Sequence, residues 1–301
     1  AEADLQGLGQ ISGYTNTMQS EHHHELVETE VVWNAGHKGS GVIVAILSTG
    51  FNSYEGDTSP KTSSVSNYST DEVNRNLRGT LYASVIAGSL GDNALLHGIA
   101  PESDLVSIRI VNDQGASSDM DVIKAITKSY EYGTDIICLD YVSNGYNQAL
   151  EEAVNATRDK GVVLFCTAGD SGTNATTYPA AYQYAYGVGA LNLNKTRMGR
   201  SNYGSSVSFA ASGGYEEKWP AAKGTGFATA VVSAQAALLI SSGKVTGTGA
   251  EFSDNLIQMM KSGSVAAKST GMGKGIVSVP KCLNLVIPNQ KPKKPQYARK
   301  S

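Results

Sequence analysis

The stretch GVIVAILSTG, residues Gly41–Gly50, decides the fold class of this chain. Its first seven residues form an unbroken apolar run, which is typical of a strand buried on both faces of a sheet. Similar runs occur at Asp104–Ile110, Asp135–Leu139 and Gly161–Cys166. Strands of this kind occur almost only in parallel sheets that are covered by helices. The four runs therefore predict an α/β protein.

Helical patterns separate the predicted strands. Apolar side chains recur every three or four residues between Ser118 and Gly133, and again between Asn147 and Gly161. Strand, helix and strand in this order form parallel crossovers, so we predict a doubly wound sheet with helices on both faces. Such sheets hold their ligands in loops beyond the carboxyl ends of the strands. The residues that follow the first, third and fourth runs are therefore the first candidates for a site: Ser48, Asp140, Tyr141 and Asp170.

Composition and charge exclude several classes of protein. Of the 301 residues, 41% are hydrophobic and 17% are charged, which excludes a disordered, collagen-like or coiled-coil chain. The formal net charge of −3 provides no basic field, so we expect no nucleic acid partner. No apolar run reaches the ~18–20 residues that span a bilayer, so an integral membrane protein is not expected. The three cysteines form no C-x-x-C motif, which argues against a disulfide framework or a cysteine zinc site.

Seven blocks of the sequence resemble, in order and spacing, the subtilisin-like serine proteases (subtilases). The blocks are residues 39–50, 78–88, 97–111, 161–170, 177–182, 201–213 and 224–239. The resemblance implies the subtilisin fold, a mainly parallel seven-stranded sheet between helices, formed as one domain. It also implies a secreted or cell-surface location, because most members of the family are secreted.

The resemblance and the composition of the two ends together predict the domain organisation. We expect an N-terminal extension over residues 1–30, a subtilisin-like domain over residues 31–283 and a basic tail over residues 284–301. The tail combines lysine, arginine and proline, and its simplest interpretation is a solvated end. The chain begins at Ala1 without a signal-like apolar region, as expected of a processed or truncated product.

The four positions at which the family carries its catalytic groups are all changed in this chain. Ser48 stands where the resemblance implies the Asp of the triad, and Arg78 stands where it implies the His. Gly226 stands where the nucleophilic Ser is expected, and Asp170 replaces the Asn of the oxyanion hole.

Each change removes part of the family's chemistry. Gly226 has no side chain to attack a carbonyl, and Arg78 stays protonated and cannot act as a general base. Asp170 places negative charge where the transition state develops its own. In subtilisin itself, loss of the triad costs about 10⁶ in turnover and loss of the oxyanion donor about 10²–10³. The sequence therefore predicts a pseudoprotease, not an enzyme, which binds a protein or peptide partner as a decoy, scaffold or regulator.

An alternative is a serine-type endopeptidase with a non-standard catalytic set. The hydroxyls within the right blocks belong to Ser84, Thr225 and Thr229. None of them has a histidine within its motif, because the five histidines are His22, His23, His24, His37 and His97. We therefore interpret the histidines as loop or surface residues.

The resemblance also places the two edges of a substrate cleft. One edge is formed by Gln114, Gly115 and Ala116, whose small residues could accept an extended strand. The other is formed by Asp140, Tyr141 and Val142, where the family has Ser-Leu-Gly. Because Arg78 and Asp170 replace two groups that face one cleft in the family, an ion pair between them is a further hypothesis, with two solvated side chains as its alternative.

Calcium is the one cofactor that the resemblance suggests. Asp57, Asp92 and Gln19 fall at or near positions of family calcium ligands, and their oxygens suit Ca²⁺. Leu95, in the same loop as Asp92, replaces a usual small residue and argues against the site.

Overall fold

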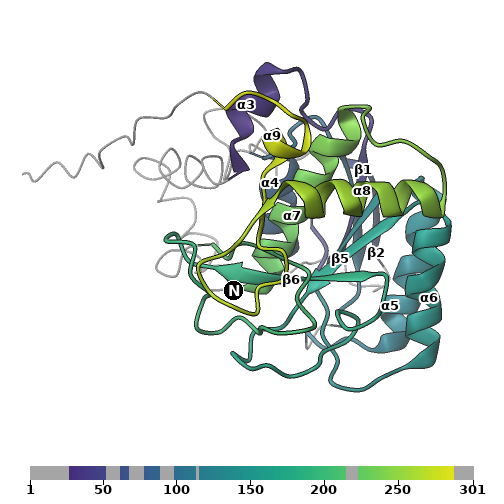
Figure 1. The fold of residues 1–301 in the computed structure, drawn as a ribbon. Helices are drawn as coiled ribbons and strands as arrows, with labels where there is room; N and C mark the ends of the chain where they lie inside the picture. The colour runs from purple at the N-terminus through teal and green to yellow at the C-terminus, as the bar shows by residue number, and fades with distance from the viewer. Residues whose placement is uncertain are drawn as a thin grey trace, which may run out of the picture.

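A computed structural model describes residues 27–51, 62–67, 78–88, 98–112, 115–214 and 223–287 of the chain. Its centre is a seven-stranded sheet in the order β2-β3-β1-β4-β5-β6-β7, and every neighbouring pair is parallel (Figure 1). The strands are β1 (Ile43–Ser48), β2 (Thr62–Asn67), β3 (Asp104–Arg109), β4 (Ile136–Leu139), β5 (Val163–Thr167), β6 (Ala185–Leu191) and β7 (Phe209–Ser212). The prediction of a mainly parallel seven-stranded sheet is confirmed.

Helices cover both faces of this sheet, as predicted. The helices are α3 (Thr29–Asn34), α4 (Arg78–Ala87), α5 (Asp119–Ser129), the 3-10 turn η1 (Tyr130–Tyr132), α6 (Gln148–Asp159), α7 (Thr225–Ser241), α8 (Ala250–Gly263) and α9 (Val279–Cys282). A short antiparallel pair, β8 (Ser264–Val265) and β9 (Ile276–Val277), lies beside β7. One hydrophobic cluster packs the sheet against α4, α7 and α8, and a second packs the opposite face against α5 and α6 (Figure 1).

The first predicted strand lies near the middle of the sheet. Strand β1 pairs with β3 on one side and with β4 on the other, so that Leu47 lies opposite Leu139. Every residue of β1 after Ile43 is buried, as an unbroken apolar run predicts. The order of the strands brings the carboxyl ends of β1, β4 and β5 side by side.

Helix α7 has 17 residues and is buried almost along its whole length. Small side chains such as Ala230 and Ala234 let it pack closely against α4 and the sheet. Its one buried amide side chain, Gln235, donates to the carbonyl of Val277 at 2.7 Å. Within the described ranges, no helix has both the length and the apolar character needed to cross a membrane.

The packed body begins before the predicted boundary at residue 31. Val27 and Thr29 are buried, and Glu28 accepts a hydrogen bond of 2.6 Å from the hydroxyl of Ser278. The division into an extension, a domain and a tail stays a prediction.

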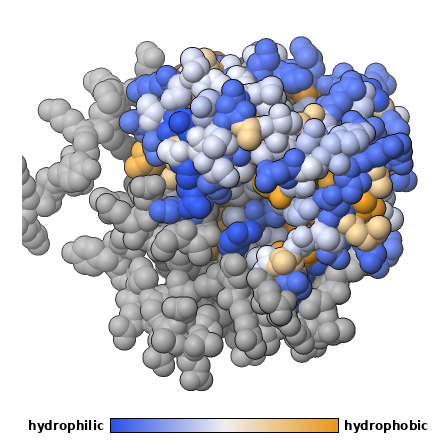
Figure 2. Space-filling view, turned by 90° about the horizontal axis from the view of Figure 1, so that it is seen from below, coloured by the Kyte–Doolittle hydropathy of each residue, from blue (hydrophilic) through white to orange (hydrophobic). Residues whose placement is uncertain are grey.

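The surface of the body is mostly polar. The face seen in Figure 2 is mainly hydrophilic, and its hydrophobic residues gather in small patches rather than in one broad area. The large hydrophobic side chains exposed in the described part are Met120, Val142, Tyr146, Leu193, Val265 and Val286.

Candidate functional site

A cleft of about 320 Å³ lies where the carboxyl ends of β4 and β5 meet the first turns of α4 and α7. Its lining includes Arg78, Gly115, Asp140, Tyr141, Val142, Asp170 and Thr225. Of the predicted triad positions, Arg78 lines the cleft, whereas Ser48 and Gly226 are buried behind it. Asp170 and four of the six predicted edge residues also line the cleft. Ala116 is exposed in the neighbouring loop and does not line the cleft, and Gln114 lies outside the described residues.

Arg78 is the first residue of α4, and its guanidinium forms an ion pair with Asp140. The hydroxyl of Ser48, at the end of β1, donates to the same carboxylate at 3.0 Å. The side chain of Asp140 is only 12% exposed, whereas that of Arg78 is 35% exposed. Burial alone would lower the pKa of Arg78, but Asp140, with smaller effects of Tyr82 and Asp170, outweighs burial and the pKa is raised.

The predicted ion pair between Arg78 and Asp170 does not form. Arg78 pairs with Asp140, and Asp170 instead lies 3.7 Å from Nε of Arg200. The physical reason is the first turn of α7, where the amide of Thr225 donates to Asp170 at 3.0 Å. A helix N-terminus attracts a carboxylate, so Asp170 is held there and not beside Arg78.

Gly226 lies in the first turn of α7, directly against a tyrosine of α4. A Cβ at this position would lie 2.8 Å from Cζ of Tyr82, closer still to the Tyr82 hydroxyl oxygen, and 3.2 Å from an oxygen of Asp140. Tyr82 is 3% exposed, and burial raises its pKa well above the usual value. The space that a side chain at residue 226 would need is therefore filled by the Tyr82 phenol.

The carboxylate of Asp170 stands at the position where the family has the Asn of the oxyanion hole. Burial raises its pKa, while the Thr225 amide and the charge of Arg200 act in the opposite direction. A Cβ at Gly224 would lie 2.5 Å from the carboxylate, and Gly224 has a φ of +119°, so this position also requires glycine. Asp170 is thus packed tightly against the start of α7.

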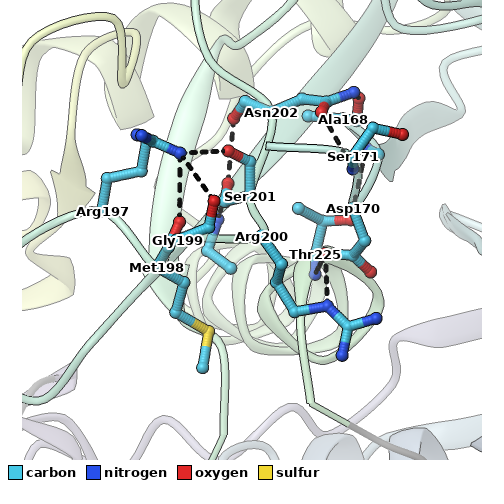
Figure 3. A network of polar contacts seen from close by, with 12 residues as sticks. Ala168, Asp170, Ser171, Arg197, Met198, Gly199, Arg200, Ser201, Asn202 and Thr225 are labelled. Carbon is cyan, nitrogen blue, oxygen red and sulfur yellow. Dashed lines mark hydrogen bonds and ion pairs between the residues drawn. The ribbon is translucent and has the colours of Figure 1, made fainter. Parts of the chain in front are cut away.

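The loop that carries Arg200 is fixed by a network of polar contacts (Figure 3). Arg197 donates through one nitrogen to the carbonyls of Met198, Gly199 and Ser201, at 3.2, 3.2 and 2.7 Å. Asn202 donates to the carbonyl of Ala168 at 3.0 Å and accepts from the amide of Ser171 at 3.1 Å. These contacts tie the loop to the segment after β5, so Arg200 reaches Asp170 from a supported backbone.

Sequence reasoning missed two residues of this site, Tyr82 and Arg200. Tyr82 follows Arg78 by four positions, which places both on one face of α4. That spacing was the available signal. Arg200 has no comparable signal, because its contact with Asp170 joins two loops.

The wall on the other side of the cleft is held by side-chain contacts. The hydroxyl of Tyr141 donates to Asp119 at 2.7 Å, and the hydroxyl of Thr167 donates to the carbonyl of Tyr141 at 3.1 Å. Val142, which follows, is 37% exposed and points an apolar side chain toward the cleft and Gly169. Asp140, Tyr141 and Val142 thus line one side of the cleft, and their contact with a substrate or partner stays a prediction.

Of the three alternative nucleophiles, Thr225 lines the cleft, where its hydroxyl oxygen accepts a hydrogen bond from the amide of Gly169 at 3.3 Å, and the other two are engaged with backbone carbonyls of their own helices. Ser84 donates to the carbonyl of Thr80 at 3.0 Å, and Thr229 donates to the carbonyl of Thr225 at 2.7 Å. His37, the one histidine within the described ranges, precedes β1, whereas the cleft lies beyond the carboxyl ends of the strands. No histidine of the described part therefore serves the cleft.

The suggested calcium ligands Gln19, Asp57 and Asp92 lie outside the described residues. Across the ranges that the structure describes, no three His, Cys, Asp or Glu side chains come together as a metal site would require. The calcium prediction therefore stays a prediction.

Comparison with known proteins agrees with this architecture. The chain is 30% identical to thermitase of Thermoactinomyces vulgaris over 230 residues, which cover 73% of this chain and 82% of thermitase. It is 29% identical to subtilisin Savinase of Lederbergia lenta, over 71% of this chain and 81% of that protein.

Solved structures share the fold at lower sequence identity. A protease of Pseudoalteromonas arctica superposes with a TM-score of 0.76 at 20% identity, over 88% of this chain and 96% of that one. MycP1 of Mycobacterium smegmatis gives a TM-score of 0.73 at 18% identity, over 93% and 88% of the two chains. The sequence also matches the Subtilase family over residues 39–275, which is most of its length. The chain therefore belongs to the subtilase family.

Proposed function

We propose that this subtilase does not hydrolyse peptide bonds and instead binds an extended protein or peptide segment in its cleft, as a decoy, scaffold or regulator. The observation that carries the proposal is the packing at Gly226. The position lacks a nucleophile, and the Tyr82 phenol fills the space where one would stand. A serine could not be accommodated there without movement of a buried ring.

The charges around Gly226 support the same conclusion. Arg78 is held in an ion pair and cannot accept a proton from an attacking group. Asp170 accepts a hydrogen bond from the amide of Thr225, and the negative charge of Asp170 would oppose a developing oxyanion. These replacements together remove the nucleophile, the base and the electrostatic stabilisation.

Binding is supported by the cleft that remains. Its two walls are built from separate segments, Gly115 with Ser117 on one side and Asp140–Val142 on the other. The hydroxyl oxygen of Ser117 is buried and makes no hydrogen bond within the described part of the chain. Since a buried hydroxyl without a partner is costly, a ligand that supplies one would be favoured. An extended segment between the two walls would offer backbone donors and acceptors for this purpose.

The absence of peptide-bond hydrolysis is tested by a proteolysis assay. The full chain is incubated with unfolded polypeptides and, separately, with a serine-directed phosphonate probe, and both samples are examined by mass spectrometry. We expect no new peptides and no covalent adduct. The alternative is a serine-type endopeptidase with a non-standard catalytic set, and it is supported by the fact that the relatives are named as proteases. Turnover that is abolished by Thr225→Val or Ser84→Ala would establish that alternative and overturn the proposal.

Binding of an extended segment in the cleft is tested by the retention of peptides on the immobilised chain. Val142→Gly is the comparison, because it removes the apolar side chain at the wall and changes the width of the cleft. Binding in the cleft predicts a different set of retained peptides for this variant. Identical sets would place the binding elsewhere.

The proposal also includes a secreted or cell-surface location and the binding of calcium. Both rest on family membership, and one relative is named as an intracellular serine protease of Paenibacillus polymyxa. Fractionation of the native source and melting in the presence of a chelator test them.

A further inference from the structure

The two carboxylates of the cleft are compensated to different degrees. Asp140 forms an ion pair with the guanidinium of Arg78 and accepts a hydrogen bond from the hydroxyl of Ser48. Asp170 accepts a hydrogen bond from the Thr225 amide, and the nearest cation among the described residues, Nε of Arg200, forms an ion pair with it at 3.7 Å, which is too long for a hydrogen bond. Within the described part of the chain, the cation that compensates Asp170 is therefore farther away than the one that compensates Asp140.

Asp170 is also the more accessible of the two. Its side chain is 30% exposed and lines the cleft, whereas that of Asp140 is 12% exposed. Arg200 is 41% exposed and stands in water beside the cleft. Water therefore still reaches the Asp170 carboxylate in the free protein, although most of the side chain is buried.

A bound segment would remove that water. A carboxylate that loses its solvent without gaining a cation is penalised, and a ligand with an apolar or acidic group at this point would bear the penalty. A ligand with an ammonium or guanidinium group would replace the water with a charge-assisted hydrogen bond, which is roughly twice as strong as a neutral one. The discrimination therefore comes from both attraction and penalty.

We propose that the segment bound in the cleft carries a cationic side chain, of lysine or arginine, that pairs with Asp170. This inference rests on the proposed function, since it assigns the chemistry of the ligand of the same cleft. It gives the carboxylate at the former oxyanion position a role in selecting the partner.

The experiment uses libraries of N-acetylated hexapeptide amides in which one position is fixed as lysine, arginine, norleucine or glutamate. The immobilised full chain is incubated with each library, and retained peptides are counted by mass spectrometry. We expect lysine or arginine at one position to be enriched roughly tenfold over norleucine, as a single charge-assisted hydrogen bond allows. Glutamate at that position should be depleted.

Two variants separate this role from a structural one. Asp170→Asn keeps an acceptor for the Thr225 amide but removes the charge, so the preference for lysine and arginine should vanish while peptides are still retained. Arg200→Gln removes the competing cation, so the preference should increase. Asp170→Glu keeps the charge and should keep the preference, and melting curves establish that each variant is folded.

The outcomes separate the two proposals. Retention of peptides with no preference for cations, or with a preference that survives in Asp170→Asn, overturns the cation inference and leaves peptide binding intact. Failure of the wild-type chain to retain any peptide overturns peptide binding and the cation inference with it.

Discussion

The packing between Gly226 and Tyr82 makes a quantitative prediction for Gly226→Ala, which adds a single carbon to the first turn of α7. That carbon would lie 2.8 Å from Cζ of Tyr82. The separation is about 0.7–1.2 Å shorter than the optimum between carbon atoms. Tyr82 is buried between α4 and α7, so its ring has little room to move aside.

The expected cost follows from two opposing contributions. Overpacking of a core costs about 1–3 kcal/mol. Replacing glycine by alanine within a helix returns up to about 1 kcal/mol. Because the contact is with a rigid ring rather than with a flexible side chain, we expect Gly226→Ala to lower the free energy of unfolding by about 1–2 kcal/mol.

The matched variants locate the cost in the contact. In a Tyr82→Val background the ring is absent, so Gly226→Ala should be neutral or stabilising by up to about 1 kcal/mol through helix propensity. Gly145→Ala is the control for glycine replacement as such, because the nearest atom to a Cβ there lies 4.0 Å away. Its effect should stay within about 0.5 kcal/mol.

The assay is urea unfolding of the four members of this double-mutant cycle, with the midpoint and the slope measured for each. The same loss of stability with valine as with tyrosine at residue 82 would refute the reasoning, and so would a Gly226→Ala chain as stable as the wild type. Gly226→Ser should behave like Gly226→Ala in this assay and should gain no peptidase activity.

Three further predictions concern the charges of the site and the cofactor. Arg78→Met removes the cation that compensates the mostly buried Asp140, so urea unfolding should report a loss of about 1–3 kcal/mol, and Arg78→Lys should lose less; equal stability of Arg78→Met and wild type would contradict the ion pair. Burial raises the pKa of Asp170, so the folded state binds the Asp170 proton more tightly than the unfolded chain does. The contribution of Asp170 to stability therefore falls as the pH rises above about 4 and through the folded-state pKa. The Asp170→Asn chain should therefore gain stability relative to wild type over that rise in pH, and a constant difference between the two would be the contrary result. Removal of calcium by a chelator should lower the melting temperature if the Asp57 and Asp92 sites are filled, and unchanged melting would remove calcium from the description.

The sequence predicted the sheet well because its central strands are buried on both faces. The runs around β1, β3, β4 and β5 contain few polar residues, and each appears within two or three residues of the predicted limits. Strand β6, AYGVGAL, lacks such a run because glycine and alanine make up four of its seven residues, and the family resemblance implied the number of strands but not this one's position. The position of the cleft followed from the parallel order, since loops after neighbouring strands must meet.

The contacts inside the cleft could not be predicted in the same way. Asp140 and Asp170 both follow strands, and nothing in the local sequence decides which of them meets Arg78. The choice depends on the start of α7, more than fifty residues later, where the Thr225 amide holds Asp170. The role of Tyr82 likewise depends on how closely α4 and α7 approach each other, which is a property of the packed core.

The replaced residues depend on one another, and this bears on how the cleft could change. Arg78 is compensated by Asp140, the Tyr82 ring fits only beside a glycine at residue 226, and the Asp170 carboxylate fits only beside a glycine at residue 224. A serine at residue 226 would still meet the Tyr82 ring, and a histidine at residue 78 would leave Asp140 without its present cation. Because each group is stable only with its neighbour, we expect single reversions toward the family pattern to lower stability without restoring hydrolysis. Under the proposed function, catalysis would require simultaneous change on α4, on α7 and at the ends of β1 and β5.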